Sequence, residues 1–243
     1  MHDYQKKYFS FYSSFTKNFT TDPSQMLIPI DDHGFHRGDG VFEAMKWKAD
    51  KIWLLDKHLD RLFVSAKLLG ITSPLEKEEI KKIIHQLVVL ANRNEGMARV
   101  FLTRGPGNFG VSPKDTIGAQ IYIVTTELKT VNPAIANEGV KIGVSQIPVK
   151  QGIFSQAKTL NYLPNVLMKK ECEDRGLDYV ISLTAEKYLA ESYTENIFFI
   201  HKKTLIYPKF DYILKGTSLV RFIELVQSAD IGKKHIHSIH EKN

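Results

Sequence analysis

One stretch organises the interpretation of the whole chain: Gln156-Ala157-Lys158-Thr159-Leu160-Asn161-Tyr162-Leu163-Pro164-Asn165-Val166-Leu167-Met168-Lys169-Lys170. Val166 and Leu167 follow Leu163 at spacings of three and four, which predicts the apolar stripe of a helix. Lys158 would then lie beside the helix N-terminus, where the partial positive charge disfavours an ammonium group. Partial burial would lower its pKa further, giving the neutral, nucleophilic amine that Schiff-base chemistry requires. A surface lysine in a loop before a helix also fits this stretch.

The composition is that of an ordinary globular protein. The chain has 243 residues, of which 43% are hydrophobic and 25% charged, enough for one large domain or two smaller ones. No apolar run approaches the roughly 18 residues that cross a bilayer, and the N-terminus lacks a signal-peptide core, so we expect a cytoplasmic protein with no membrane partner. Cys172 is the only cysteine. An intrachain disulfide and a paired-cysteine zinc site are therefore excluded, and a structural role for this thiol is favoured.

The formal charge of +6 raises the question of a nucleic-acid partner. The basic residues occur in pairs spread along the chain, such as Lys81-Lys82, Lys169-Lys170 and Lys233-Lys234. None of these pairs alternates with stacking aromatic residues, so nucleic acid is not expected. Small anionic substrates or a phosphate-bearing cofactor fit the charge at least as well.

The first half of the chain predicts strands together with two helices. Alternation and β-branched residues predict strands at residues 8–12, 26–30, 41–48, 51–55, 97–103 and 119–125. The first helix is expected to begin at an N-cap, Asp56, and its stripe is formed by Leu59, Leu62, Phe63, Ala66 and Leu69. The second helix is expected over residues 75–93. Arg61 lies off the stripe, where an arginine is either solvated or a good phosphate ligand.

Two glycine-rich segments interrupt these elements. In residues 31–45, three glycines accompany Asp, His and Arg, which suits either chemistry or simple turns. The segment Arg104-Gly105-Pro106-Gly107-Asn108-Phe109-Gly110-Val111-Ser112-Pro113 has no periodicity. Such a loop suits contact with a substrate.

The second half predicts another α+β block after a linker within residues 127–138. Strands are expected at residues 140–145, 179–183, 197–201 and 204–207. Gly216-Thr217-Ser218 opens a helix and could bind an anion through backbone N–H groups, hydroxyls and the helix dipole, or could be a plain N-cap. The histidines in residues 234–240 alternate as in an edge strand. No carboxylate cluster accompanies them, so no metal is expected.

Five short motifs, spread over about residues 30–225, occur in the order that is typical of one enzyme family. They are Asp39-Gly40-Val41-Phe42-Glu43, His58-Leu59-Asp60-Arg61-Leu62, Lys158-Thr159-Leu160-Asn161-Tyr162-Leu163, Glu191-Ser192-Tyr193-Thr194-Glu195-Asn196-Ile197-Phe198 and Leu214-Lys215-Gly216-Thr217-Ser218. With these motifs the chain resembles the class IV aminotransferases. These are the fold-type IV pyridoxal-phosphate enzymes, which include branched-chain and D-amino-acid aminotransferases and aminodeoxychorismate lyase.

The resemblance implies an α+β protein of two domains. Residues 1–128 would form a small N-terminal α/β domain, and residues 129–243 a larger, β-barrel-like C-terminal domain with helices that binds the cofactor. Members of the family usually continue for some tens of residues beyond the point that matches Ser238. We therefore expect the last strands of the C-terminal domain to be missing from this chain, which ends at Asn243.

The resemblance also implies pyridoxal 5′-phosphate as the cofactor and gives each candidate residue a role. Lys158 would be the Schiff-base lysine and the general acid and base, and Glu191 the partner of the pyridine nitrogen. The other implied cofactor-binding residues are Arg61, Tyr162, Asn196, Gly216, Thr217 and Ser218. Tyr162 is one residue closer to the lysine than the tyrosine that branched-chain enzymes place on the cofactor's 3′-oxygen. The implied substrate-facing residues are Phe42, Arg104 and Phe109.

These roles imply transfer of an amino group between an amino acid and a 2-oxo acid. They also imply a homodimer, because fold-type IV sites are completed across a subunit interface. Aminodeoxychorismate lyase activity, an elimination that releases pyruvate, is the alternative, and a noncatalytic cofactor-binding relative is a third hypothesis. Arg104 is not followed by the arginine and histidine with which D-amino-acid enzymes hold a carboxylate. The substrate and its stereochemistry are therefore left open.

Overall fold

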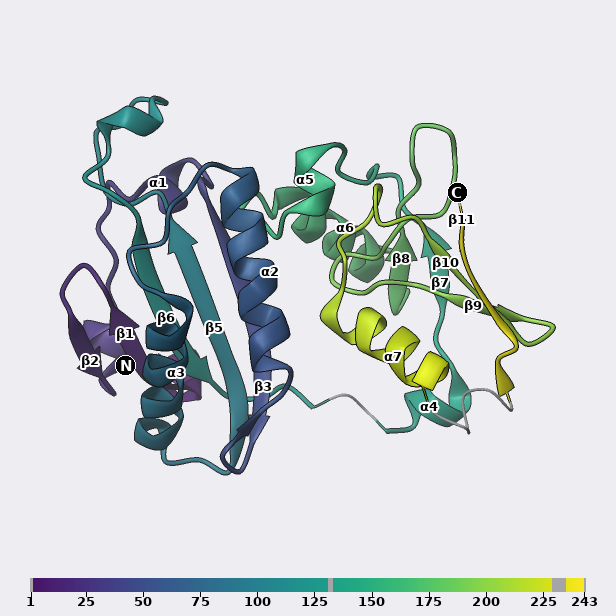
Figure 1. Cartoon of the computed structure of the whole chain (residues 1–243), viewed down its shortest axis with the longest axis horizontal. Coiled ribbons are helices and arrows are strands. Elements are labelled where there is room, and N and C mark those ends of the chain that lie inside the picture. The colour runs from purple at the N-terminus through teal and green to yellow at the C-terminus, as the bar shows by residue number, and fades with distance from the viewer. Residues whose placement is uncertain (1, 131–132, 229–234, 243) are drawn as a thin grey trace. The chain divides into compact units, whose positions relative to one another are not determined.

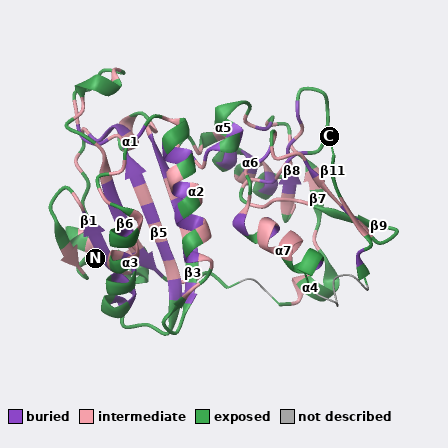
Figure 2. Cartoon of the chain, viewed as in Figure 1, coloured by how far each residue is buried: buried purple, intermediate pink, exposed green. Residues whose placement is uncertain are grey.

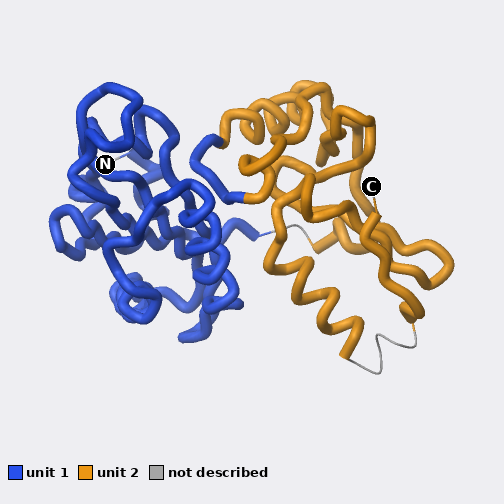
Figure 3. The backbone as a smooth tube through the Cα atoms, turned by 45° about the horizontal axis from the view of Figure 1, so that its top comes forward, with its two compact units in different colours: residues 1–130, 157–161 blue, residues 131–156, 162–243 orange. Residues whose placement is uncertain are grey.

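The computed structural model describes residues 2–130, 133–228 and 235–242, and Figure 1 shows the order of their helices and strands. The chain divides into two compact units. One consists of residues 1–130 with 157–161, and the other of residues 131–156 with 162–243 (Figure 3). Sequence analysis predicted a boundary after residue 128 but assigned the 157–161 segment to the second domain. This segment contains Lys158, which therefore belongs to the first unit.

An antiparallel sheet forms the centre of the first unit. Among the described residues its strands follow the order β2-β1-β6-β5-β3-β4. Their bounds are β1 (Tyr8–Ser13), β2 (Asn18–Thr20), β3 (Gly40–Lys48), β4 (Lys51–Ile52), β5 (Glu95–Thr103) and β6 (Gln120–Thr126). β3 pairs with β5 from Gly40↔Thr103 to Lys48↔Glu95. Because side chains alternate between the faces of a strand, Glu43 shares a face with the buried Val41 and Met45.

Short helices and one misassigned segment connect these strands. The short helices are η1 (Asp3–Lys7), η2 (Pro23–Gln25), α1 (His33–His36) and η3 (Pro113–Asp115). The strand predicted at residues 26–30 is wrong, since this segment has no ladder partner and lies outside the strands. Pro29 cannot donate a ladder hydrogen bond, and Leu27 and Ile30 are exposed, so neither pairing nor burial favours a strand here.

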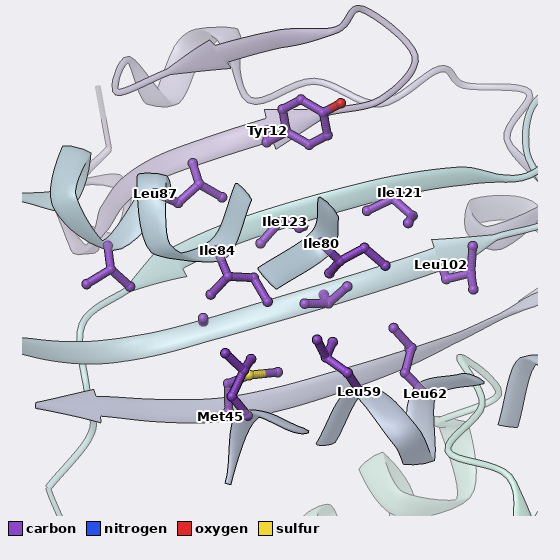
Figure 4. Packing of buried hydrophobic residues seen from close by; sticks show 14 of the residues in the cluster. Tyr12, Met45, Leu59, Leu62, Ile80, Ile84, Leu87, Leu102, Ile121 and Ile123 are labelled. Atoms are coloured by element: carbon purple, nitrogen blue, oxygen red, sulfur yellow. The ribbon is translucent and has the colours of Figure 1, made fainter. Parts of the chain in front are cut away.

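Two helices pack on one face of this sheet. They are α2 (Leu55–Leu68) and α3 (Lys77–Ala91). Figure 4 shows Leu59 and Leu62 of α2 and Ile80 and Ile84 of α3 pointing towards side chains of the strands. Each is fully buried, which stabilises the fold by about 1.5–3 kcal/mol per side chain. The predicted stripe on the first helix is confirmed, and Figure 2 shows the buried residues concentrated along the strands of the sheet.

The start of α2 differs from the prediction. The helix begins at Leu55, and its N-cap is Leu54 in the left-handed conformation (φ 52°), so Asp56 is not the N-cap. Asp56 lies in the first turn instead, where a carboxylate complements the helix dipole. It also forms ion pairs with Lys81 at 2.7 Å and Lys77 at 3.3 Å, which join α2 to α3.

The second unit contains smaller sheets and four helices within its described residues. The helices are α4 (Ile135–Glu138), α5 (Ile153–Gln156), α6 (Leu163–Asp174) and α7 (Thr217–Ser228). The strands are β7 (Ile142–Val144), β8 (Tyr179–Ile181), β9 (Phe199–His201), β10 (Thr204–Pro208) and β11 (Ser238–Lys242). β7 pairs with β8, and β10 lies between β9 and β11. The α+β class is confirmed, but the described strands do not close into a barrel.

Helix α6 buries a different face from the one predicted. Leu163, Val166 and Leu167 are 66%, 57% and 42% exposed. The buried side chains are Asn165, Met168 and Cys172. Cys172 packs with Met168 and Val180, and its thiol donates to the Leu177 carbonyl oxygen at 2.9 Å. The structural role predicted for the cysteine is confirmed, whereas the predicted stripe does not face a core of this unit.

Candidate active site

The predicted site residues divide between the two units. Lys158, Arg61, Phe42, Arg104 and Phe109 belong to the first unit. The second unit contains the other predicted cofactor-binding residues, Tyr162, Glu191, Asn196, Gly216, Thr217 and Ser218.

Lys158 lies in an extended segment that pairs with the start of β3. The Phe42 amide donates to the Lys158 carbonyl oxygen at 2.9 Å, and the Leu160 amide donates to the Gly40 carbonyl oxygen at 2.9 Å. Gly40 permits this close approach, because a Cβ there would lie 2.7 Å from a Leu160 methyl carbon. The amide of Lys158 donates to Ser65 Oγ on α2 at 3.1 Å. Both sides of the lysine backbone are therefore held.

The half-buried Lys158 side chain lies over an aromatic ring. Its Nζ is 4.5 Å from the centroid of the Phe42 ring, and Phe42 stacks on Phe101 with centroids 6.1 Å apart. The predicted helix start is confirmed, since α6 begins at Leu163, but α6 belongs to the other compact unit, so an effect of its N-terminus on the Lys158 amine stays a prediction. A cation held over the face of an aromatic ring at this distance is attracted by the ring.

A buried carboxylate orients Arg61. Glu43 of β3 is fully buried, and its two oxygens accept from Arg61 Nε at 2.7 Å and Arg61 Nη2 at 2.8 Å. His58 Nδ1 lies 2.7 Å from Glu43 Oε2. Burial alone would raise the pKa of Glu43, but the hydrogen bonds from Arg61 and His58, together with the guanidinium charge, lower it. The ion pair with Glu43 therefore fixes the orientation of the Arg61 guanidinium, which suits a phosphate ligand. The phosphate-binding role of Arg61 stays a prediction.

Arg104 has a well-defined structural task in this conformation. Its Nε and Nη2 donate to the Asp39 carboxylate at 2.9 and 3.0 Å. Its Nη1 and Nη2 donate to the carbonyl oxygens of Gly70 and Leu69, just beyond α2, at 2.7 and 2.9 Å. These contacts join the 104–113 loop to the end of α2. They give no support to the predicted substrate contact of Arg104, which stays a prediction.

Phe109 lies exposed at the tip of the same loop, with its ring centroid 5.0 Å from that of His36. The loop is attached to α1 by Arg37, whose Nε donates to the Gly110 carbonyl oxygen at 3.1 Å. An exposed aromatic side chain on an attached loop is consistent with substrate contact, so this prediction stays open.

In the second unit, one hydrogen-bond network joins Glu191 to the start of α7. Glu191 Oε2 accepts from the Leu214 amide at 3.1 Å and from Asn196 Nδ2 at 3.3 Å. The same Asn196 amide donates to the Leu214 carbonyl oxygen at 2.9 Å. The backbone of Glu191 is fixed as well, because its carbonyl oxygen accepts from the Ser182 amide at 2.9 Å. Carboxylate and loop are therefore positioned together.

The predicted phosphate loop lies where that network ends. α7 begins at Thr217, and the Val220 amide donates to the Gly216 carbonyl oxygen at 2.9 Å. A Cβ on Gly216 would lie 1.8 Å from Asn196 Oδ1, so this position has no room for a side chain. A helix N-terminus of this kind presents N–H groups and a positive partial charge to an anion. A carboxylate for a pyridine nitrogen and a helix N-terminus for a phosphate fit pyridoxal phosphate.

Tyr162 is the N-cap residue of α6. A second lysine, Lys150, contacts its ring, and this lysine was not among the predicted site residues. Lys150 Nζ lies 5.3 Å from the Tyr162 ring centroid. Burial lowers the pKa of Lys150, and the Glu191 carboxylate offsets part of that effect. Lys150 follows Val149, which packs with Ala190 and Ile213 in one buried cluster. This cluster brings Lys150 into the electrostatic range of Glu191.

Sequence analysis also passed over Glu43, His58 and Ser65. The first two stand inside motifs that were quoted, without a role of their own. The signal for Ser65 was helical spacing, since His58, Arg61 and Ser65 follow one another at intervals of three and four residues on one helix face. Within the described ranges, no three His, Cys, Asp or Glu side chains gather as metal ligands, and no helix is long and apolar enough to cross a membrane.

A family model described as class IV amino-transferase matches residues 40–242. This chain belongs to the class IV aminotransferase family, and the resemblance inferred from the five motifs is confirmed. Among its relatives, a chloroplastic D-amino-acid transaminase of Arabidopsis thaliana is 37% identical over 224 residues, covering 91% of this chain. A putative branched-chain-amino-acid aminotransferase of Methanocaldococcus jannaschii is 29% identical over 214 residues, covering 86% of this chain. The chain spans 59% of the plant protein's length and 73% of the archaeal protein's length.

Solved structures show the same fold. The branched-chain amino acid aminotransferase of Escherichia coli superposes with a TM-score of 0.85 at 22% identity, covering 97% of this chain and 78% of that one. The 4-amino-4-deoxychorismate lyase of Pseudomonas aeruginosa gives a TM-score of 0.78 at 20% identity, covering 96% of this chain and 82% of that one. The fold is therefore shared by transferases and a lyase, and it does not choose between these reactions.

Proposed function

We propose that this chain is a pyridoxal-phosphate-dependent aminotransferase, which moves an amino group between an amino acid and a 2-oxo acid. The observation that supports this most is the placement of Lys158. Its backbone is held by β3 and α2, and its amine lies half-buried against Phe42. When bound, pyridoxal phosphate supplies an electron sink for the negative charge that develops at the substrate α-carbon.

Lys158 has two tasks in this proposal. Its Nζ would hold the cofactor covalently until the substrate amine takes its place, and the freed amine would then take the proton from the α-carbon of the amino acid and, in the second half of the transfer, deliver a proton to the α-carbon of the acceptor 2-oxo acid. The held backbone and the Phe42 ring limit the positions open to this amine, and so help to set the distance over which a proton is transferred.

Glu191 keeps its carboxylate in one orientation for the pyridine nitrogen of the cofactor. The Leu214 amide and Asn196 hold Oε2. A fixed carboxylate favours a proton on the pyridine nitrogen and so makes the ring a better acceptor of negative charge. Asn196 contributes by joining Glu191 to Leu214 and by packing against Gly216.

Arg61 and the Gly216-Thr217-Ser218 segment are assigned to the phosphate. Glu43 presents the Arg61 fork in a fixed direction, which lowers the entropy lost when a phosphate binds. The N-terminus of α7 offers backbone N–H groups and hydroxyls. Tyr162 is assigned to the 3′-oxygen side of the cofactor, beside Lys150.

The names of the relatives suggest the substrate class. They include D-amino-acid, D-alanine and branched-chain-amino-acid aminotransferases. An apolar or small amino acid with a 2-oxo acid as its partner fits the aromatic rings of Phe42 and Phe101. A homodimer and a cytoplasmic location are part of the same proposal, and sedimentation at micromolar concentration tests the first of these.

An activity panel tests the proposed reaction. The full chain with pyridoxal phosphate is assayed with L- and D-amino acids plus 2-oxoglutarate, and separately for pyruvate release from aminodeoxychorismate. Transfer to 2-oxoglutarate supports the proposal. Pyruvate release alone identifies a lyase, and cofactor binding without either reaction identifies a noncatalytic relative. Lys158→Ala is expected to abolish turnover, whereas Lys169→Ala, which removes an exposed ion pair with Glu173, is expected to leave it unchanged.

A further inference from the structure

Ser65 is a fully buried polar residue that contacts the backbone of Lys158. It lies on α2, and its Oγ accepts the Lys158 amide hydrogen at 3.1 Å across 93 positions of sequence. Ser65 lies on the same helix face as His58 and Arg61, and burying its hydroxyl brings no hydrophobic gain. Its contact with the candidate lysine gives it a specific partner instead.

The Ser65 contact completes the attachment of Lys158. On the carbonyl side of the residue, the Phe42 amide of β3 donates to the Lys158 oxygen at 2.9 Å. On the amide side, Ser65 Oγ accepts from the Lys158 N–H group at 3.1 Å. One hydrogen bond therefore comes from the sheet and the other from the helix, so the Cα of Lys158 is held between two rigid elements.

Helix α2 also carries Arg61, the other candidate cofactor-binding cation of this unit. Arg61, one turn before Ser65, is paired with Glu43 of β3. Leu59 and Leu62 anchor the same helix in the core, where both are fully buried. A change in the position of Lys158 relative to α2 therefore changes its position relative to Arg61 as well.

We propose that Ser65 is a positioning residue for Lys158, which it holds by its main-chain amide so that the amine stays over Phe42. This inference rests on the proposed function of Lys158 as the reacting amine. Without the hydroxyl, a part-buried N–H group loses its acceptor, and the 157–161 segment can move away from α2. A displacement of about 1 Å at a reacting group can lower a rate by about a hundred-fold.

Three Ser65 variants and one matched control test this role. Ser65→Ala removes the acceptor, Ser65→Cys keeps the size with a weak acceptor, and Ser65→Thr keeps a hydroxyl. Ser10→Ala is the control, because Ser10 is equally buried in the same unit and donates to the Leu87 carbonyl oxygen at 2.8 Å, on α3. It removes a buried hydroxyl without changing the partner of Lys158.

The first readout is the rate of hydrogen exchange at the Lys158 amide, which NMR measures on the full chain as purified. We expect exchange to accelerate by about ten-fold or more in Ser65→Ala, less in Ser65→Cys, and little in Ser65→Thr. The second readout is the kinetics. We expect kcat to fall by about ten- to hundred-fold in Ser65→Ala while KM changes little, with recovery in Ser65→Thr. Ser10→Ala should change neither quantity at a temperature where it is folded.

Two outcomes overturn the inference. Unchanged exchange at Lys158 in both Ser65→Ala and Ser65→Cys shows that the hydroxyl does not hold the amide. A fall in kcat no larger than that of Ser10→Ala shows that the contact is only structural. Borohydride reduction of the wild type shows whether the proposed function itself has failed. A cofactor label on a lysine other than Lys158 overturns both the proposed function and the role of Ser65. A label on Lys158, together with unchanged amide exchange or with a fall in kcat no larger than the control's, overturns the role of Ser65 alone.

Discussion

Replacing Glu43 by glutamine tests how the first unit holds its arginine. The carboxylate is fully buried and accepts two hydrogen bonds from Arg61, at 2.7 and 2.8 Å, and lies 2.7 Å from His58 Nδ1. Glutamine keeps the shape and one acceptor oxygen, but it places an N–H₂ group against a donor. The guanidinium is then left partly unpaired in a low-dielectric site.

The magnitude follows from the number and type of the contacts. Removing one partner of a buried ion pair costs about 3–5 kcal/mol, and a charge-assisted hydrogen bond contributes about 1.5–3 kcal/mol. Because glutamine preserves one of the two oxygens, we expect Glu43→Gln to lower the free energy of unfolding by about 2 kcal/mol and Glu43→Ala by about 3–5 kcal/mol. These are large fractions of a typical total of about 5–15 kcal/mol.

Urea unfolding of the full chain measures this loss. Glu95→Gln is the matched control, because Glu95 forms a distant, largely exposed pair with Lys48 at 3.9 Å and should contribute at most about 0.5 kcal/mol. Combining Glu43→Ala with Arg61→Ala gives the coupling energy between the two side chains. If Glu43→Gln loses no more stability than Glu95→Gln, the account of Glu43 as the residue that orients Arg61 is refuted.

Three further predictions concern Glu43, Arg61 and Gly216. The pKa of Glu43 is lowered in the folded state, so the stability that its carboxylate contributes is present above the unfolded glutamate pKa of about 4.3 and is lost as the pH falls through the folded value. The free energy of unfolding of the wild type should therefore fall below about pH 4.3, and that of Glu43→Gln should depend less on pH. Arg61→Ala should weaken pyridoxal phosphate binding by about ten- to hundred-fold, but should hardly change the binding of pyridoxal without its phosphate, as followed by absorbance titration. Gly216→Ala places a Cβ 1.8 Å from Asn196 Oδ1, so it should cost about 1–3 kcal/mol of stability and weaken cofactor binding, both measurable by thermal unfolding with and without the cofactor.

The sequence identified helices better than it identified their buried faces. On α2 the stripe that includes Leu59 and Leu62 is buried, because the sheet lies directly against it. On α6 the same periodicity selected Leu163 and Val166, which are exposed, while Met168 and Cys172 form the packed face. Periodicity shows that a segment is helical, but the rest of the fold decides which face meets a core.

In the candidate site, too, the sequence predicted individual residues but not the distant residues that they contact. Lys158 and Glu191 could be proposed from the sequence, because the motifs that contain them resemble those of the class IV aminotransferases. Their partners could not, because Ser65 is 93 positions from Lys158, and Leu214 is 23 positions from Glu191. Arg104 was assigned to substrate from its loop, whereas Asp39 bonds with its guanidinium at 2.9 and 3.0 Å. Contacts between distant segments depend on the tertiary fold.

Borohydride reduction determines whether Lys158 is the lysine that binds the cofactor. The full chain is loaded with pyridoxal phosphate, reduced, digested and mapped by mass spectrometry. We expect the fixed cofactor on the peptide that contains Lys158, and no fixed cofactor in Lys158→Ala. Reduction that labels Lys150 beside Tyr162, or Lys169 or Lys215, in place of Lys158 would contradict the assignment of the site.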